Sequence, residues 1–180
     1  MTLILSALLF SLSSNLDNVV VGIAYGIKKI KIGITSNLII AIVTSTGTFL
    51  SMEVGTYISK FLPHSISNIL GAAVIIILGI YFVTQSIIKL INSSKSNELA
   101  LNNISDMITY AEKSDLDSSG DINMKEALIV AIGLTFNNLG TGVAANITGV
   151  SIQFTVICTF ILSIFTIIFG EAVGNHVLGK

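Results

Sequence analysis

Among the residues with carboxylate or amide oxygens inside long apolar runs of the sequence, where polar atoms need partners, six are candidates for binding chemistry. They are Asp17, Asn18, Glu53, Asn137, Asn138 and Glu171. A charged side chain at the centre of a membrane span costs at least about 2.5–3.5 kcal/mol, so it normally faces a cavity or a partner. Because oxygen ligands favour Mg2+, Ca2+ or Mn2+ over softer metals, these residues predict a site for a hard divalent cation. We expect its centre near the two adjacent pairs, Asp17–Asn18 and Asn137–Asn138.

Each of these residues also has a structural interpretation. Asp17 lies on a stripe of hydroxyl residues along an apolar helix and could bond to them, and the paired asparagines could join helices by hydrogen bonds. Glu53 and Glu171 lie near the ends of their runs, so they either line an ion path or reach interfacial water. A polar core that only holds helices together is therefore an alternative to a transport site.

The segment Asp115–Glu126 reads Asp-Leu-Asp-Ser-Ser-Gly-Asp-Ile-Asn-Met-Lys-Glu and has the spacing of an EF-hand loop. Counted from its first residue, oxygen side chains fall at positions 1, 3, 5 and 9, glycine at position 6 and glutamate at position 12. An EF-hand needs oxygens around a hard cation, a glycine at the sharp turn and a bidentate glutamate. We predict weak binding of Ca2+, or of Mg2+ or Mn2+; the alternative is a solvated acidic linker that caps the next helix. The candidate ligands are Asp115, Asp117, Ser119, Asp121, Asn123 and Glu126.

The composition excludes a soluble domain. Of 180 residues, 52% are hydrophobic and only 11% are charged, with a mean hydropathy of +0.89, whereas soluble domains carry about 25% charged residues. The chain therefore needs lipid as its solvent. We expect the lipid bilayer and a divalent metal ion as its partners, no nucleic acid, no enzymatic activity and no required cofactor. The one cysteine, Cys158, rules out an intrachain disulfide.

Five apolar runs are long enough to span a membrane, which takes about 20 residues. They are Thr2–Gly26, Ile34–Ser59, Ile66–Ile91, Ala127–Val150 and Ser151–Gly174. Lys28, Lys29 and Lys31 fill the first short loop, whereas Lys60 stands alone in the second. The positive-inside rule therefore predicts a multi-pass protein of the cell membrane, with its N-terminus outside and the linker 93–126 in the cytoplasm.

The first and fourth runs align with each other. Leu16–Ala24 can be laid on Phe136–Ala144, so that Asp17 meets Asn137 and the next asparagine of each copy also matches. The two copies start on opposite sides of the membrane, as in the inverted repeats of many transporters, where the site lies near the midplane.

We therefore expect an all-α integral membrane protein built as an inverted repeat of three-helix units. Residues 1–92 would form the first membrane repeat, residues 93–126 a cytoplasmic linker that contains the EF-hand-like loop 115–126, and residues 127–180 the second repeat. Five transmembrane helices are expected to be present. The sixth helix of such a plan is expected to be missing, through truncation of the second repeat.

The stretch Ser14–Gly26 with the lysine-rich loop after it, and the stretch Asp115–Gly149, resemble the YtaF-like sporulation membrane protein family. That family is similar to the manganese efflux pump family, which has two three-helix repeats and an aspartate in the first helix of each. The resemblance implies efflux of a divalent cation, with Mn2+ as the substrate. Asp17 matches the first aspartate of the pumps, and Asn137 stands where the second would be.

Two other functions stay open on the sequence. One is a non-transporting membrane protein with a role in sporulation, whose polar core only joins helices. The other is an amino-acid exporter of related architecture, although no basic residue lies at mid-span to meet a carboxylate. The sequence contains no ATP-binding motif of the form G-x-x-x-x-G-K-[ST], so we expect an ion gradient to drive any transport.

Overall fold

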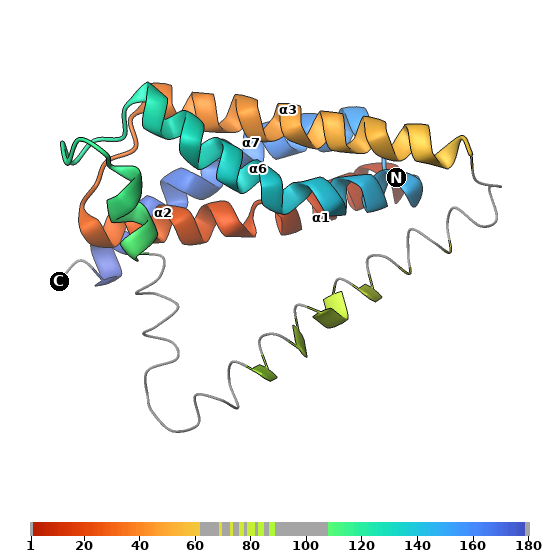
Figure 1. Ribbon diagram of the computed structural model, residues 1–180, viewed down its shortest axis with the longest axis horizontal. Coiled ribbons are helices and arrows are strands. Elements are labelled where there is room, and N and C mark those ends of the chain that lie inside the picture. The colour runs from red at the N-terminus through yellow and green to blue at the C-terminus, as the bar shows by residue number, and fades with distance from the viewer. Residues whose placement is uncertain are drawn as a thin grey trace.

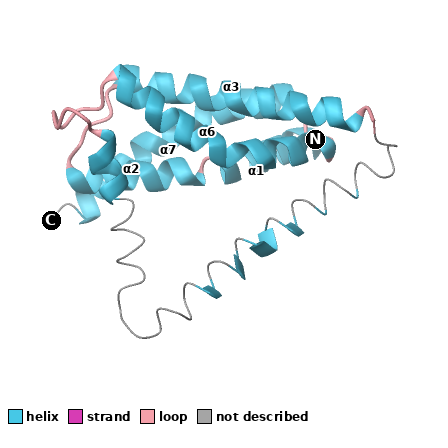
Figure 2. Cartoon of the chain, in the orientation of Figure 1, coloured by secondary structure: helices cyan, strands magenta, loops and turns pink. Residues whose placement is uncertain are grey.

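The computed structural model is a helical bundle in the parts of the chain that it describes, residues 2–61 and 108–178 with scattered helical residues between 69 and 88 (Figure 1). The labelled helices are α1 (Thr2–Ser14), α2 (Leu16–Lys28), α3 (Ile34–Ser59), α6 (Met124–Ile147), α7 (Ile152–Val173) and the π-helical turn η1 (Gly174–Leu178). Residues 108–114 form a further short helix. Within these ranges there is no strand, only one isolated β-bridge, which confirms the predicted all-α class (Figure 2).

Three helical stretches are long and apolar enough to cross a membrane: Ile4–Lys28, Ile34–Ser59 and Ile152–His176. They coincide with the predicted first, second and fifth spans. The predicted fourth span corresponds to α6, which counts as a fourth stretch if its bent halves form one span. The predicted third span, Ile66–Ile91, lies mostly outside the described residues, and the linker from residue 93 to residue 107 lies wholly outside them. These helices confirm the prediction of a membrane protein with several spans. The inverted repeat and the total number of spans stay predictions.

Both copies of the aligned sequence motif lie where a helix departs from regular geometry. Asn15 separates α1 from α2 and has φ −104° and ψ 7°. In α6, the halves before and after Asn137 meet at an angle of 46°. Such interruptions free backbone groups inside a span, and membrane proteins tolerate them where neighbouring helices supply new partners.

The helices pack as two parallel pairs, α2 with α7 and α6 with α3. Along the first pair, Asn18 lies beside Ser163 and Gly22 beside Ile167, so both contacts are 145 residues apart in sequence. Along the second pair, the constant separation is 88 residues, as for Ser51 beside Leu139. A constant separation means that both helices of a pair run in the same direction.

Glycines bring the backbones of α2 and α7 into direct contact. A Cβ atom added to Gly22 would lie 2.6 Å from the backbone oxygen of Ile167. Gly26 on α2, Gly170 on α7 and Gly174 after it face the opposite backbone in the same manner. Because lipid is as apolar as the helix surfaces, close packing of small residues is a main source of helix association in membranes.

At one end of the bundle, here called the loop end, the segment 29–33 meets the segment 115–123 (Figure 1). The Lys31 N–H donates to the Gly120 oxygen at 2.9 Å, and the Ile122 N–H donates to the Lys31 oxygen at 2.9 Å. The Ser36 hydroxyl also donates to the Ile122 oxygen, at 2.5 Å. The first loop and the linker therefore lie at the same end of the bundle, as the lysine distribution requires.

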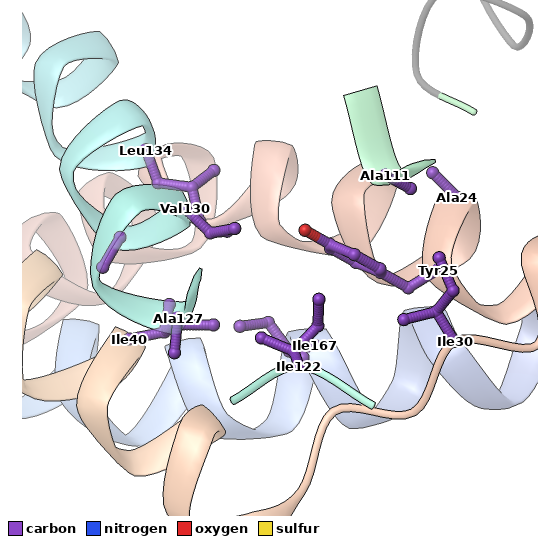
Figure 3. Packing of buried hydrophobic residues seen from close by; sticks show 11 residues of the cluster. Ala24, Tyr25, Ile30, Ile40, Ala111, Ile122, Ala127, Val130, Leu134 and Ile167 are labelled. Carbon is purple, nitrogen blue, oxygen red and sulfur yellow. The ribbon is translucent and has the colours of Figure 1, made fainter. Parts of the chain in front are cut away.

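Just inside the loop end, apolar side chains from several segments form the hydrophobic core (Figure 3). Tyr25 and Ile167 are fully buried in it, and Ile30 and Ile122 enter it from the two loops. The remaining buried members are Ala24, Ile40, Ala111, Ala127, Val130, Ala131 and Leu134. This core joins α2, α3, α6 and α7 to both loops.

We predict that Gly22→Ala lowers the stability of the purified full-length protein in detergent by about 1–3 kcal/mol, the usual cost of overpacking. The added methyl group would press on backbone atoms of α7, which cannot turn aside as a side chain could. Thermal unfolding followed by circular dichroism measures the change. Gly140→Ala is the matched control, because a Cβ there meets nothing within 4 Å, and equal melting temperatures for the two variants would contradict the packing.

Candidate functional site

The junction of α1 and α2 carries a relay of buried amides. The Asn15 Nδ2 atom donates to the Ser11 oxygen at 2.7 Å, and the Asn18 Nδ2 atom donates to the Asn15 Oδ1 atom at 2.8 Å. The same Asn18 nitrogen donates to the Ser163 Oγ atom of α7 at 3.0 Å. Asn18 is only 1% exposed, and both partners of its amide nitrogen are protein side chains.

This relay fixes the direction of the Asn18 amide. The Asn15 nitrogen must face the Ser11 carbonyl, so the Asn15 oxygen can only accept and the Asn18 nitrogen must donate to it. The Asn18 Oδ1 atom then points away from these partners, and no donor meets it in the described part of the chain. On α3, the Asn37 Nδ2 atom donates to the Ile164 oxygen at 3.2 Å, and its Oδ1 atom is likewise buried without a donor there. The Oδ1 atoms of Asn18 and Asn37 are thus two buried acceptors that meet no donor in the described part of the chain.

A stripe of hydroxyl groups on α7 completes the polar layer. The Thr44 and Ser163 hydroxyl oxygens lie 3.4 Å apart, and the Thr159 hydroxyl donates to the Ser11 hydroxyl at 3.2 Å. Thr155, Thr159 and Ser163 are almost fully buried. Our sequence interpretation missed this stripe, although its spacing of four residues is a signal of one helix face.

The second aligned motif reaches the first through Asn138. Its Nδ2 atom, on α6, donates at 3.1 Å to the backbone oxygen of Ser14, the last residue of α1. This contact is close in sequence to Asp17, whose side chain is half-buried and whose Oδ1 atom accepts the Asn18 N–H at 2.9 Å. The side chain of Asn137 lies outside the described residues, so its predicted role stays a prediction.

The two glutamates lie away from this junction. Glu53 is exposed on α3, nine residues beyond Thr44 and thus about 13 Å further along the helix. Glu171 is half-buried near the loop end, beside the Ile32 N–H and Lys31. The predicted ion path through both residues is not tested by these positions.

The EF-hand-like loop brings its acids together. Carboxylate oxygens of Asp115, Asp117 and Glu126 all lie within 4.8 Å of one another. Asp115 and Glu126 are buried and Asp117 is exposed. Gly120 adopts φ 78°, the left-handed conformation that glycine takes most easily.

The loop also caps α6. The Asn123 Oδ1 atom accepts the N–H groups of Lys125 and Glu126, and the Glu126 Oε2 atom accepts the Asn123 N–H at 2.9 Å, which together form a capping box. The Glu126 Oε1 atom accepts the Leu116 N–H at 2.8 Å, and Asp115 accepts the Gly120 N–H at 2.9 Å. The loop therefore makes the helix-capping contacts of the alternative interpretation. The carboxylates of the loop also converge, as a cation site requires.

The pKa of Asp117 lies below its ordinary value because the Ser119 hydroxyl and backbone N–H both stabilise the carboxylate. We predict that Ser119→Ala raises the pKa of Asp117 and that Ser119→Thr, which keeps the hydroxyl, does not. A lowered folded-state pKa stabilises the loop at neutral pH, and this contribution is lost as the pH falls through that pKa. An NMR titration of Asp117 in metal-free full-length protein measures the shift, and identical titrations of the two variants would contradict it.

No family model and no solved structure matches this chain. Among curated proteins, it is 29% identical over 184 residues to the "Probable sporulation protein YtaF" of Bacillus subtilis (strain 168). The alignment covers 97% of this chain and 87% of that protein. This similarity over nearly the whole chain confirms its resemblance to the YtaF-like family of sporulation membrane proteins.

Proposed function

We propose that the protein exports a divalent cation, with Mn2+ as the substrate, across the cytoplasmic membrane. The observation that carries the proposal is the hydrogen bond from Asn138 to the Ser14 oxygen. It joins the two aligned motifs beside Asp17 and Asn18, inside the apolar spans. A site between repeats at this level is a common plan of secondary transporters.

The chemistry of this layer suits a cation better than an amino acid. The amide nitrogens of Asn15, Asn18 and Asn138 are all used in bonds to protein oxygens. The buried Asn18 Oδ1 atom meets no donor in the described part of the chain, and Asp17 brings a carboxylate next to it in sequence. A hard cation is bound by such oxygens, whereas the carboxylate of a zwitterion would need free donors or a basic residue.

The helix pairing supports the inverted repeat. The first span packs along the fifth, through α2 and α7, and the fourth packs along the second, through α6 and α3. The second helix of each repeat would thus pack against the first helix of the other repeat. Gly22 and its aligned counterpart Gly142 both lie in these contacts, against Ile167 and Ser51 respectively.

The loop end would face the cytoplasm in this proposal. Lys28, Lys29 and Lys31 gather there, and the positive-inside rule favours such a segment on the cytoplasmic side. The N-terminus would then lie outside. An ion gradient would supply the energy, because the sequence has no ATP-binding motif of the P-loop type.

A non-transporting role in sporulation is the second candidate. It rests on the name of the Bacillus subtilis relative and on the fact that the amide relay by itself joins α1, α2, α6 and α7. The two candidates differ in what they require of Asp17. Transport requires its charge, whereas a purely structural role requires only its hydrogen bonds.

We therefore predict that Asp17→Asn abolishes Mn2+ export and leaves the protein folded in the membrane at its normal level. The amide keeps the size and bonding capacity of the side chain, and interhelical hydrogen bonds in membranes average only about 0.6 kcal/mol. Cellular manganese, measured by elemental analysis in cells with and without the protein, gives the readout. Glu98→Gln is the control, because it removes one carboxylate from the linker 93–126, outside the predicted spans.

Two results would decide against this proposal. Equal manganese in cells with and without the wild-type protein rejects Mn2+ export and favours the sporulation role without transport. Export by Asp17→Asn at the wild-type rate rejects the site at the α1–α2 junction.

We also propose that the loop 115–126 binds Ca2+ weakly, with Mg2+ or Mn2+ as competitors. The convergence of Asp115, Asp117 and Glu126 fits the first, third and twelfth positions of an EF-hand. Ser119 and Asn123 would add oxygens, and position 7, Asp121, would contribute its backbone carbonyl. Rearrangement is small, because Glu126 already points into the loop to accept the Leu116 N–H.

Glu126→Gln should weaken Ca2+ binding by at least about 10–100-fold, the range measured when supporting groups alone are removed from metal sites. Asp121→Asn is the control, because it removes one negative charge from the loop and leaves the backbone ligand in place. Isothermal calorimetry on the full-length protein compares them. Equal heats for Glu126→Gln and wild type would leave the loop as a helix cap and linker only.

A further inference from the structure

Three residues of the linker hold the end of α2 in place. This strap, Gly120–Ile122, exchanges two backbone hydrogen bonds with Lys31, three residues after the end of α2. Nothing in the EF-hand pattern requires these bonds, since they join the loop to another part of the chain. The strap is therefore a connection between the first membrane segment and α6.

Side chains reinforce the connection on both sides. The Ser36 hydroxyl, from the first turn of α3, donates to the Ile122 oxygen at 2.5 Å. Lys28, the last residue of α2, forms an ion pair with Glu112 of the short helix 108–114. The ends of α2 and α3 are thus both fastened to the segment that leads into α6.

Beneath the strap, the hydrophobic core closes the bundle between the loop end and the amide relay. Ile122 is only 4% exposed and carries the strap into this core, where Tyr25, Val130 and Ile167 are fully buried (Figure 3). Tyr25 lies seven residues beyond Asn18, about 10 Å along α2. The polar layer is therefore separated from the loop end by a packed apolar plug, made of the core residues named above.

The helix under the strap is suited to moving as a unit. α2 has only 13 residues and begins at the interruption at Asn15. Its contact with α7 is made by glycines on both helices, which present smooth backbone surfaces. Small sliding movements of packed helices are a common way for proteins to open and close.

We infer that the strap is a gate: bound to Lys31, it keeps the plug closed at the loop end, and its release lets α2 move so that a path opens from Asn18 to that end. Closure of the plug by the strap is inferred from the hydrogen bonds of the strap to Lys31 and from the burial of Ile122 in the core. Its use in transport rests on the proposed export function.

The gate is tested by labelling a thiol inside the plug of the full-length protein. Val130→Cys, in a Cys158→Ser background, serves as the reporter, and Lys28→Gln with Ser36→Ala weakens the strap. In inside-out vesicles, an impermeant maleimide should label the reporter about tenfold faster when the strap is weakened, as expected from the loss of one exposed ion pair and one hydrogen bond. Equal labelling rates with and without the strap substitutions overturn the inference.

A second reporter separates gating from general loss of structure. Ala7 is fully buried on α1, away from the loop end, so Ala7→Cys should label at the same slow rate in both backgrounds. A parallel rise at Ala7→Cys would mean that the whole bundle loosens, and it would overturn the gate.

Transport is tested by locking the strap. Lys31 and Asp121 are β-bridge partners, so Lys31→Cys with Asp121→Cys, also in Cys158→Ser, can be joined by a short bifunctional thiol reagent that a reductant cleaves. Joining should stop Mn2+ export and reduction should restore it, while the same reagent should leave export by the Cys158→Ser protein unchanged. Continued export by the joined protein would overturn the gate. If the wild-type protein does not export Mn2+, the proposed substrate is rejected, and the thiol-labelling rates alone then decide whether the strap closes the plug.

Discussion

Lipid supplies no hydrogen bonds, and this constraint governs the interior of the protein. Each polar group inside a span must find its partner on another helix or pay a large desolvation cost. At the interruption, the side-chain amides of Asn15 and Asn138 donate to the carbonyls of Ser11 and Ser14 at the end of α1. Asn18 then binds Ser163 on α7. Four helix segments are neighbours at this point because their few polar atoms require one another.

The same hydrogen bonds leave some side-chain oxygens without donors. An asparagine side chain has two donor hydrogens and an oxygen that can accept two bonds, so a cluster of amides that donate to carbonyls and hydroxyls accumulates unused oxygens. Asn18 and Asn37 each keep a buried Oδ1 atom without a donor in the described part of the chain. The negative charge of Asp17 lies next in sequence to Asn18. The arrangement that gives each amide nitrogen a hydrogen-bond acceptor therefore also leaves oxygens that suit a cation.

At the loop end, a single carboxylate serves several elements. Glu126 completes the capping box of α6, accepts the Leu116 N–H and lies with Asp115 in the candidate cation site. The adjoining strap carries Ile122 into the core and bonds to Lys31. A cation that shifted Glu126 or stiffened the loop would act directly on the strap, because both belong to the same twelve residues.

Local features of this protein followed from the sequence alone. The second span was predicted with the bounds that α3 has, and capping of the next helix by the acidic linker was one of the two interpretations of the segment before α6. These features depend on residues close in sequence, since hydropathy over about 20 residues and cap chemistry are both local. Asn138 of the second aligned motif contacts Ser14, three residues before Asp17, and the cation site expected between the two motifs stays a prediction.

The tertiary structure alone decided which helices pair and which polar groups meet. Thr159 and Ser163 entered no sequence-based site, and neither the parallel pairing of α2 with α7 nor the bonds of Lys31 to the strap could be inferred. In a soluble protein, the contrast between polar and apolar faces would indicate the buried side of each helix. Inside a membrane that contrast is lost, because side chains facing lipid and side chains facing another helix are equally apolar. Glycine contacts and the needs of a few polar atoms then choose the partners, and these become defined only when the helices come together.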